Sequence, residues 1–340
     1  MNRLNLLVLF GGMAEEHNVS IKSAKQLAGW LNPQKYNTYF VYITPNGEWR
    51  MVATPDGSLS DGKQVTLCAN RIFQGLIGLE QNERIAIDVV FPMLHGNYGE
   101  DGTMQGLLEL SGIDYVGCDL TASAICMDKS LTYLVAKQAG VAVPQFTILE
   151  DENVSIGNLS YPVFVKPARS GSSFGVTKVS CQSELEAAVN EARKYDSKVL
   201  VEEAVIGHEV GCAVLSSEEG VITGEIDQIE LTGGFFRVHQ EKQPEKGSEN
   251  SVIHVPAKIS YDLRCKVAET AKKLYRAIGC QGLARVDMFL LSDGTVMLNE
   301  INTMPGFTSY SRYPRMMKAS GFSMNTVVDQ LIIEARGGKE

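Results

Sequence analysis

Residues 285–302 read RVDMFLLSDGTVMLNEIN, in which two apolar runs flank the dipeptide Asp293-Gly294. An Asp-Gly pair between two such runs is a strong signal for a β-hairpin. Counting outward from this turn gives two facing pairs of polar residues: Asp287 with Glu300, and Arg285 with Asn302. Because alternate residues of a strand point the same way, we expect these four side chains to share one face of the hairpin.

Two carboxylates that face each other directly across a hairpin repel, so Asp287 and Glu300 need a cation between them. Asp, Glu and Asn supply only oxygen ligands, which suit Mg²⁺ rather than zinc. The hairpin therefore predicts a divalent metal site at Asp287, Glu300 and Asn302. The alternative is a solvated face with an ordinary surface Asp and Glu. The apolar flanks and the position of Asn302 favour the metal site.

A second polar segment, GSSFG at 171–175, follows a predicted strand that ends near Lys166. Backbone N–H groups of such a loop, together with a nearby lysine, can bind phosphates. The loop is not a Walker A motif. It matches the G-x-S-x-G motif of hydrolases, but that motif needs a helix directly after the serine, and the following VTKV favours a strand. Phosphate binding is the favoured interpretation, and a plain glycine-rich hairpin loop is the alternative.

Two further glycine-containing segments follow apolar runs that are typical of buried strands. GGMAEEH at 11–17 follows the run at 4–10, and HGNYGEDG at 95–102 follows the run at 85–91. The carboxyl ends of parallel strands meet at one edge of a sheet, where open α/β sheets bind ligands. With a helix predicted over 18–31, this order indicates a parallel α/β domain with a pocket at that edge.

The remaining pattern divides the chain into further units. A helix over 121–138 opens a compact α+β unit, and the last part of the chain holds long strands, a helix over 261–278 and a polar loop at 232–251. The stretch 53–84 is polar and weakly patterned, which predicts a surface excursion. The predicted domains are residues 1–120, 121–206 and 207–340.

Composition excludes several classes of function. The 340 residues carry a net charge of −9, so nothing favours binding to nucleic acid or to an acidic membrane surface. No apolar window is long enough to span a bilayer. Seven cysteines without C-x-x-C spacing predict reduced thiols and a cytoplasmic protein. Because the chain is acidic overall, an anionic ligand must be held by a few well-placed cations.

These segments together resemble the D-alanine–D-alanine ligase family of the ATP-grasp fold, over nearly the whole chain except 53–84. The matching motifs are GGMAEEHNVS (11–20), HGNYGEDG (95–102), MDKS (127–130), VFVKPARSGSSFGV (163–176), RVDMF (285–289) and NEINTMPGFTSYS (299–311). The resemblance implies an α/β and α+β three-domain fold and a homodimer. It also implies an enzyme that uses ATP with Mg²⁺ or Mn²⁺ to activate a carboxylate as an acyl phosphate, which a second substrate attacks.

Within this family the chain is more similar to the branch that makes D-alanyl-D-lactate for the cell wall of glycopeptide-resistant bacteria. HGNYGEDG, the run at 109–133 and the loop FRVHQEKQPEKGSEN at 236–250 carry this similarity. Dipeptide-forming members have a Tyr preceded by a Lys in that loop, where this chain has His239. Met13 departs from the cysteine of the resistance ligases, and Glu203 departs from a frequent lysine, which leaves the role of that side chain open.

The resemblance also implies roles for individual residues. Glu16 binds the ammonium of the first D-alanine, Ser172 steadies Glu16, and His95 shapes that pocket. Residues implied in ATP binding are Lys129, Lys166, Ser172, Glu202, Glu203, Val205, Glu209 and Asn299. Those implied at the reaction centre are Asp287, Glu300 and Asn302 with two Mg²⁺ ions, Arg285 and the Gly306 N–H as an oxyanion hole, and Ser311 and the Arg312 backbone on the carboxylate of the second substrate. Lys22 and Glu245 join the first domain to a lid formed by 232–251.

The charge of His239 gives a physical reason for selectivity. A partly protonated imidazole would repel the ammonium of D-alanine and attract the carboxylate of D-lactate. A surface-loop histidine without function is the alternative. The sequence leaves open a D-alanine–D-alanine ligase, a D-alanine–D-serine ligase and a non-catalytic nucleotide sensor. The loop histidine separates the first of these, and the complete set of metal-site residues with Arg285 argues against the sensor.

Overall fold

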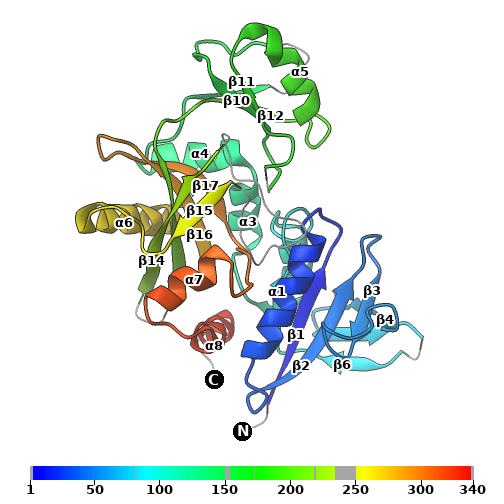
Figure 1. The fold of residues 1–340 in the computed structure, drawn as a ribbon. Coiled ribbons are helices and arrows are strands. Elements are labelled where there is room, and N and C mark those ends of the chain that lie inside the picture. The colour runs from blue at the N-terminus through cyan, green and yellow to red at the C-terminus, as the bar shows by residue number, and fades with distance from the viewer. Residues whose placement is uncertain are drawn as a thin grey trace.

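The computed structural model describes residues 3–80, 82–149, 154–171, 173–217, 220–233 and 250–337, and these form three β-sheets with helices packed on them (Figure 1). The first sheet has the strand order β6-β5-β4-β3-β2-β1-β7-β8. Its strands are β1 (Leu4–Gly11), β2 (Tyr36–Ile43), β3 (Trp49–Val52), β4 (Lys63–Leu67), β5 (Gly75–Gly78), β6 (Arg84–Ala86), β7 (Val89–Met93) and β8 (Asp114–Tyr115).

The centre of this first sheet is parallel, as predicted, because β1 pairs with β2 and β7 in that sense and β7 pairs with β8. β1 is apolar on both faces and needs cover on both. Leu6, Val8 and Phe10 pack towards α1 (His17–Trp30), whereas Leu7 and Leu9 pack with residues of α2 (Thr103–Ser111). This double cover is what a buried parallel strand requires.

The stretch 53–84, predicted to be mostly a surface excursion, is largely exposed but also contains strands. This stretch contributes β4, β5 and the start of β6, which extend the sheet by antiparallel pairing. The strands are short and expose many residues, but Val65, Leu67 and Leu76 are buried in the same core as Leu7. The run predicted as one strand at 85–91 is likewise split between β6 and β7.

The second sheet has the order β11-β10-β12-β9 and is antiparallel throughout. Its strands are β9 (Phe146–Leu149), β10 (Val163–Pro167), β11 (Thr177–Val179) and β12 (Val199–Glu203), with α5 (Gln182–Ala192) packed on one face. The helix predicted over 121–138 is two helices, α3 (Leu120–Met127) and α4 (Lys129–Gln138). Asp128 separates them, because its carboxylate accepts the N–H groups of Ser130 and Leu131 and caps α4.

The third sheet has the order β15-β14-β13-β16-β17. Its strands are β13 (His208–Ser217), β14 (Gly220–Leu231), β15 (Ser251–His254), β16 (Leu283–Leu290) and β17 (Val296–Asn302). α6 (Tyr261–Ile278) covers one face, and α7 (Arg312–Ala319) and α8 (Met324–Ala335) cover the other. The predicted domain boundaries near 120 and 206 fall at the start of α3 and between β12 and β13, and they stay a prediction.

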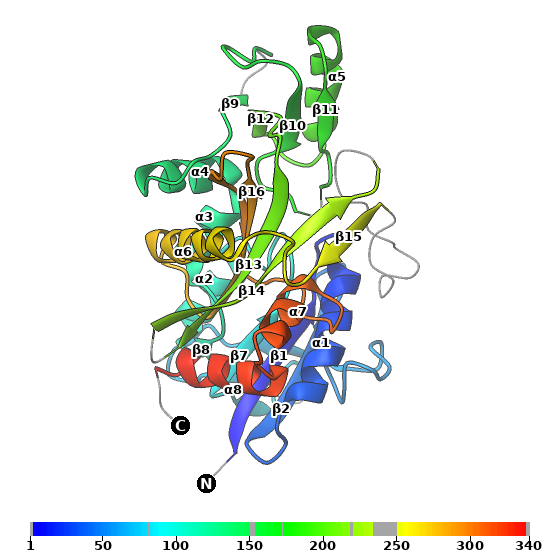
Figure 2. The ribbon, with the colours of Figure 1, turned by 60° about the vertical axis from the view of Figure 1, so that its left-hand side comes forward.

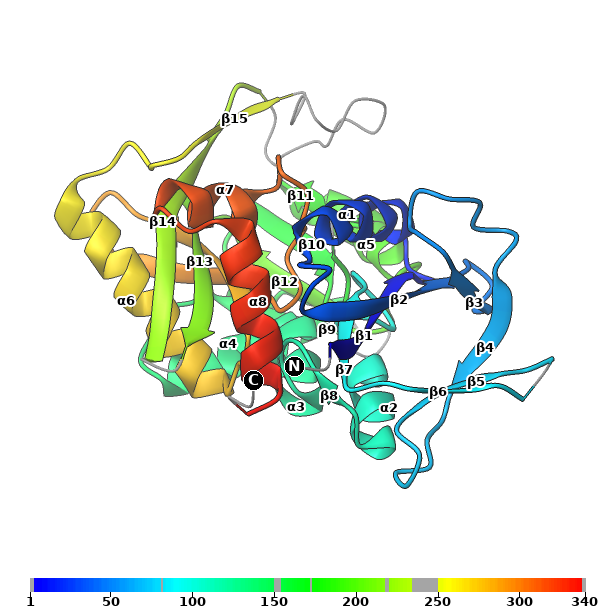
Figure 3. The same cartoon turned by 90° about the horizontal axis from the view of Figure 1, so that it is seen from below.

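One apolar core joins the first and third sheets. Leu6 and Phe91 of the first sheet, Leu215 of the third, and Tyr313 and Val327 of α7 and α8 belong to the same buried cluster. Figures 2 and 3 show α7 and α8 between β13–β14 and the α1–β1 layer. The two sheets are therefore held at a fixed separation. Of the helices in the described part of the chain, none combines the length and apolar character needed to cross a membrane.

Candidate active site

A cleft of about 1690 Å³ lies where the three sheets approach one another. Most of the residues singled out from the sequence line it, although they come from all three predicted domains. These are Glu16, Lys22, His95, Lys129, Lys166, Glu202, Val205, Glu209, Arg285, Asp287, Asn299, Glu300, Asn302, Gly306, Ser311 and Arg312. Glu203 is not among the lining residues, because its carboxylate accepts the Ser160 N–H at 2.9 Å. Ser172, His239 and Glu245 lie outside the described residues.

The hairpin of β16 and β17 has the predicted pairs, Asp287 with Glu300 and Arg285 with Asn302. The predicted turn was nevertheless one residue too short, since Leu291 pairs with Thr295 around a three-residue loop. A bulge then skips Asn299, because Met288 faces Leu298 while Asp287 faces Glu300. The longer turn and the bulge each shift the pairing by one residue, in opposite directions, so the predicted pairs are kept. Bulges re-aim side chains, and this one lets adjacent residues of β17 line the cleft.

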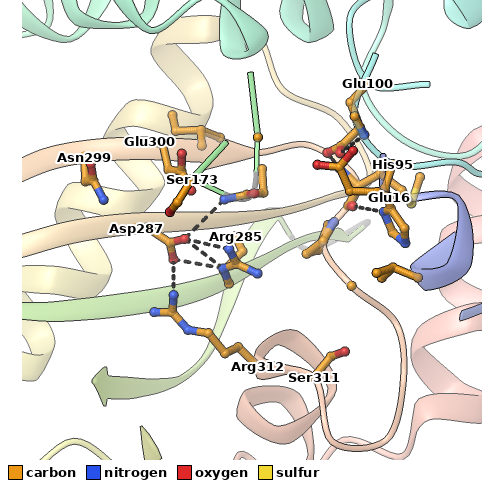
Figure 4. A pocket seen from close by; sticks show the side chains of 18 of the residues that line it. Glu16, His95, Glu100, Ser173, Arg285, Asp287, Asn299, Glu300, Ser311 and Arg312 are labelled. Carbon is orange, nitrogen blue, oxygen red and sulfur yellow. Dashed lines mark hydrogen bonds and ion pairs between the residues drawn. The ribbon is translucent and has the colours of Figure 1, made fainter. Parts of the chain in front are cut away.

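Asp287 is the centre of a buried set of ion pairs, with a side chain only 2% exposed. The Arg285 guanidinium binds it twice, with its Nε at 2.9 Å and its second terminal nitrogen at 2.7 Å. A nitrogen of Arg312 lies 3.2 Å from its other oxygen, and the Asn302 amide donates at 3.2 Å. Figure 4 shows these interactions meeting at Asp287. A buried carboxylate needs such partners, because burial alone would neutralise it.

The Arg312 side chain has a role that the sequence did not indicate. Its Nε and one terminal nitrogen bind the two oxygens of Asp227, each at 2.7 Å, and its other nitrogen lies 3.3 Å from Glu209. A Cβ at Gly211 would lie 2.2 Å from this guanidinium, so glycine is required there. We call Asp227, Arg312, Asp287, Arg285 and Glu209 the charge network. Asp227 was missed because its partner is 85 residues away and no motif marks it.

Ser311 stands directly before α7 without a capping side-chain hydrogen bond, and it lines the cleft. Its hydroxyl lies 2.6 Å from that of Thr308, and a Cβ at Gly306 would lie 3.0 Å from it. The backbone at 306–312 thus folds back on itself beside the hairpin. The first residue of α7 is Arg312, so the charge network ties this helix terminus to the third sheet.

Two lysines enter the cleft from the second sheet and from α4. Lys166 lies 2.6 Å from Glu202, whose second oxygen accepts the hydroxyl of Tyr133 at 2.9 Å. Lys129 donates to the Ser170 carbonyl at 2.7 Å and lies 3.6 Å from Glu300. Burial lowers the pKa of Lys129, and the nearby Glu300 opposes this shift. Both ammonium groups therefore sit in a dry region where a phosphate would be attracted strongly.

The opposite side of the cleft is formed by Glu16 and the 95–102 segment (Figure 4). A Cβ at Gly96 would lie 2.4 Å from one oxygen of Glu16, and a Cβ at Gly171 would lie 2.8 Å from the other. The carboxylate is therefore held between a loop of the first sheet and the Gly/Ser loop. His95 and Glu100 lie behind it, and burial raises the pKa of Glu100 to about 7. Glu100 belongs to HGNYGEDG, so that motif could have marked it.

The donor chemistry of the hairpin fits a divalent cation. Glu300 and Asn302 offer oxygen atoms on one wall, and Asn302 can offer its carbonyl oxygen because its amide nitrogen is used on Asp287. The oxygens of Asp287 are bound by Arg285, Arg312 and Asn302, so this residue would exchange one of these partners for the cation. Among the described residues, no group of three or more His, Cys, Asp or Glu side chains is arranged to hold a metal. A metal site on this hairpin therefore depends on Asn302 as a ligand.

Glu209 lies at the edge of the charge network and has a shifted pKa. Burial and the negative charges around Glu209 raise its pKa to about 7, although the positive charge of Arg312 acts in the opposite direction.

Comparisons with known proteins agree with the resemblance. The family model described as D-ala D-ala ligase N-terminus matches residues 5–118, and the model of the C-terminus matches 135–333. A Streptomyces coelicolor protein with the provisional name D-alanine–D-lactate ligase is 56% identical, over 100% of this chain and 99% of that protein. The vancomycin/teicoplanin A-type resistance protein VanA of Enterococcus faecium is 52% identical, over 99% of this chain and 100% of VanA.

The solved structure of the VanG D-Ala:D-Ser ligase from Enterococcus faecalis has the same fold. Its TM-score is 0.89 at 40% identity, and the match covers 98% of this chain and 100% of that chain. The similarity therefore includes the 53–84 region, in which no motif of the family was found. With both family models and full-length relatives in agreement, the chain belongs to the D-alanine–D-alanine ligase family and has its ATP-grasp fold.

Proposed function

We propose that this protein is an ATP-dependent D-alanine–D-lactate ligase that makes D-alanyl-D-lactate for a modified cell-wall precursor. The observation that carries the proposal is the cleft. It places a carboxylate that can bind an ammonium, Glu16, in one cleft with buried lysines and with the hairpin residues Glu300 and Asn302. The choice of D-lactate is supported by full-length similarity to the Streptomyces coelicolor protein and to VanA.

The first step forms D-alanyl phosphate. Glu16 binds the ammonium of D-alanine, and one carboxylate oxygen attacks the γ-phosphorus of ATP as the bond to ADP breaks. Lys129 and Lys166 bind phosphate oxygens, since both are buried ammonium groups that line the cleft. Mg²⁺ held by Asp287, Glu300 and Asn302 would neutralise charge on the transferring phosphoryl group. Glu202, Val205, Glu209 and Asn299 line the part of the cleft assigned to the nucleotide.

The second step forms the ester. The hydroxyl oxygen of D-lactate attacks the carbonyl carbon of D-alanyl phosphate, the hydroxyl proton is lost and phosphate leaves. Arg285 and the Gly306 N–H bind the oxyanion of the tetrahedral intermediate. Ser311 and the backbone N–H of Arg312 hold the carboxylate of D-lactate at the start of α7, where a helix terminus favours an anion.

Selection of D-lactate is assigned to His239, which lies outside the described residues. Its partial positive charge near neutral pH disfavours an incoming ammonium and favours a carboxylate. Lys22 lines the cleft on α1 and is the partner assigned to Glu245 at the lid. A homodimer, a cytoplasmic location and the use of two Mg²⁺ ions, for which Mn²⁺ can substitute, are further parts of the proposal.

Phosphate release from ATP tests the function. With D-alanine alone at pH 7 the enzyme should release little phosphate, and D-lactate should stimulate release with formation of one ester per phosphate. Stimulation by D-serine instead would assign the enzyme to D-alanine–D-serine ligation. Equal release with D-alanine alone would assign it to dipeptide synthesis, and no release under any condition would leave a nucleotide-binding protein.

A further inference from the structure

The segment Met304–Phe307 leaves β17 and carries Gly306 into the cleft. Its backbone is held from the first sheet and α1 rather than by the third sheet from which it emerges. Glu100 accepts the Met304 N–H at 2.9 Å with one oxygen and the Gly96 N–H at 2.9 Å with the other. The Nδ1 of His95 donates to the Met304 carbonyl at 2.8 Å. Both polar groups of the Met304 peptide are therefore fixed.

Ser23 of α1 holds the other end of the segment. Its hydroxyl oxygen accepts the Phe307 N–H at 3.2 Å and lies 3.2 Å from the Nε2 of His95. Because Nδ1 of His95 carries the proton that binds Met304, Nε2 of the neutral ring must accept, and the Ser23 hydroxyl donates to it. Burial lowers the pKa of His95 to about 4, so the ring is uncharged near neutral pH. Ser23 is fully buried, and His95 is 6% exposed.

The clamped segment leaves one backbone donor uncommitted. Met304 and Phe307 donate to Glu100 and Ser23, and Pro305 has no N–H. Among the residues that the structure describes, the Gly306 N–H has no hydrogen-bond partner, although Gly306 lines the cleft. A free donor between two fixed ones is the arrangement that a preorganised oxyanion hole needs.

We propose that Ser23, His95 and Glu100, the backbone clamp, are positioning residues that fix the Gly306 N–H for the tetrahedral intermediate. The inference rests on the proposed two-step ligation. It assigns His95 to the second step, whereas the sequence-based hypothesis placed His95 in the pocket for the first D-alanine. The two assignments differ in a measurable way. A pocket residue changes the KM for D-alanine, whereas a positioning residue changes the rate of attack on D-alanyl phosphate.

The test separates the two steps. D-alanyl phosphate formation is followed in a single turnover with ATP and D-alanine, trapping the acyl group with hydroxylamine; product formation is then followed with the second substrate present. Ser23→Ala should slow product formation roughly ten- to a hundredfold, the range expected for a misplaced catalytic donor, with the trapped hydroxamate rate and KM for D-alanine nearly unchanged. His95→Ala should act alike, and His95→Asn, which keeps a donor for the Met304 carbonyl, should recover part of the rate.

Ser20→Ala is the matched control. Ser20 is also fully buried on α1, one turn before Ser23, but its hydroxyl joins Gly11 to Met93 inside the first sheet. This variant should leave the ratio of the two step rates at the wild-type value. Three results would overturn the clamp: equal slowing of both steps by Ser23→Ala, a ratio in Ser20→Ala that is changed as much as in Ser23→Ala, or a raised KM for D-alanine in His95→Asn.

Every variant is measured with D-lactate and with D-alanine as second substrate. A wild type that refuses D-lactate but makes the dipeptide overturns the proposed substrate, and the dipeptide reaction still tests the clamp. If Ser23→Ala does not fold, the ratio of the two step rates is measured in His95→Asn and Glu100→Gln instead. Glu100→Gln replaces one acceptor oxygen by an amide nitrogen and should therefore slow the second step as well.

Discussion

The two sides of the cleft are held by different kinds of interaction. On the hairpin side, the charge network is built on buried Asp227, Asp287 and Arg312, which have one another as partners. On the first-sheet side, the backbone clamp consists of side chains bonded to peptide groups. Paired ions fix where charge lies, whereas bonds to peptide groups fix the path of the chain. In the proposed mechanism the hairpin carboxylates act in phosphoryl transfer, whereas the backbone clamp acts through Gly306 in the attack on the acyl phosphate.

The largest expected effect comes from removing a charge on the hairpin side. Glu300→Gln keeps the shape of the side chain but lowers the charge that attracts a divalent cation. The barrier should rise by several kcal/mol, so ligation should fall on the order of a thousandfold or more while the fold is kept. Turnover and circular dichroism check this. A folded Glu300→Gln enzyme with near-normal turnover would remove the hairpin from the metal site.

The next effect tests whether the charge network stabilises the fold. Asp227→Ala leaves the Arg312 guanidinium buried without its two-point partner. Breaking a buried pair in this way costs about 3–5 kcal/mol of unfolding free energy. Urea unfolding measures it, with Asp262→Ala, in the exposed first turn of α6, as the control for losing a carboxylate. A loss as small as that of the control would show that Arg312 is stabilised elsewhere.

A smaller effect is expected on the first-sheet side. Glu16→Gln removes the charge that binds the ammonium of the first D-alanine and weakens a charge-assisted bond by about 1.5–3 kcal/mol. The affinity for D-alanine should fall while ATP affinity is nearly unchanged, as calorimetry can measure. Glu15→Gln is the control, because Glu15 also lines the cleft but is exposed. Equal losses in both variants would place the ammonium elsewhere.

The smallest effect is a dependence of stability on pH. The pKa of Glu209 is raised to about 7 in the folded protein, so the folded state binds a proton there that the unfolded state has lost. The stabilisation of the folded state by this proton is therefore present near pH 5 and is lost as pH rises through about 7. In Glu209→Gln the free energy of unfolding should fall less between pH 5 and 7, by on the order of 1 kcal/mol. An identical decline in both proteins, measured by urea unfolding, would assign it to another group such as Glu100.

The sequence was informative where function depends on neighbours along one strand pair. The hairpin pairs followed from counting outward from Asp293-Gly294, although a longer turn and a bulge both had to occur for the count to hold. The charge network and the backbone clamp could not be predicted, because Arg312 meets Asp227 from 85 residues away and His95 meets Met304 from 209 residues away. The strands within 53–84 were missed for a related reason. Their burial comes from edge pairing to a sheet, which a polar exposed face conceals.

The most direct test of the account is the product mixture formed with D-alanine and D-lactate both present. Wild type and His239→Ala are compared by mass spectrometry from about pH 6 to 9, across the range in which a histidine with an ordinary pKa loses its charge. We expect the wild type to make mainly D-alanyl-D-lactate at pH 6 to 7 and more dipeptide above, and His239→Ala to lose most of its use of D-lactate. In that variant, the titration of the D-alanine amine should be the remaining cause of any change in the product mixture with pH. A wild type that makes only dipeptide at pH 6, or two identical partitioning curves, would contradict the account.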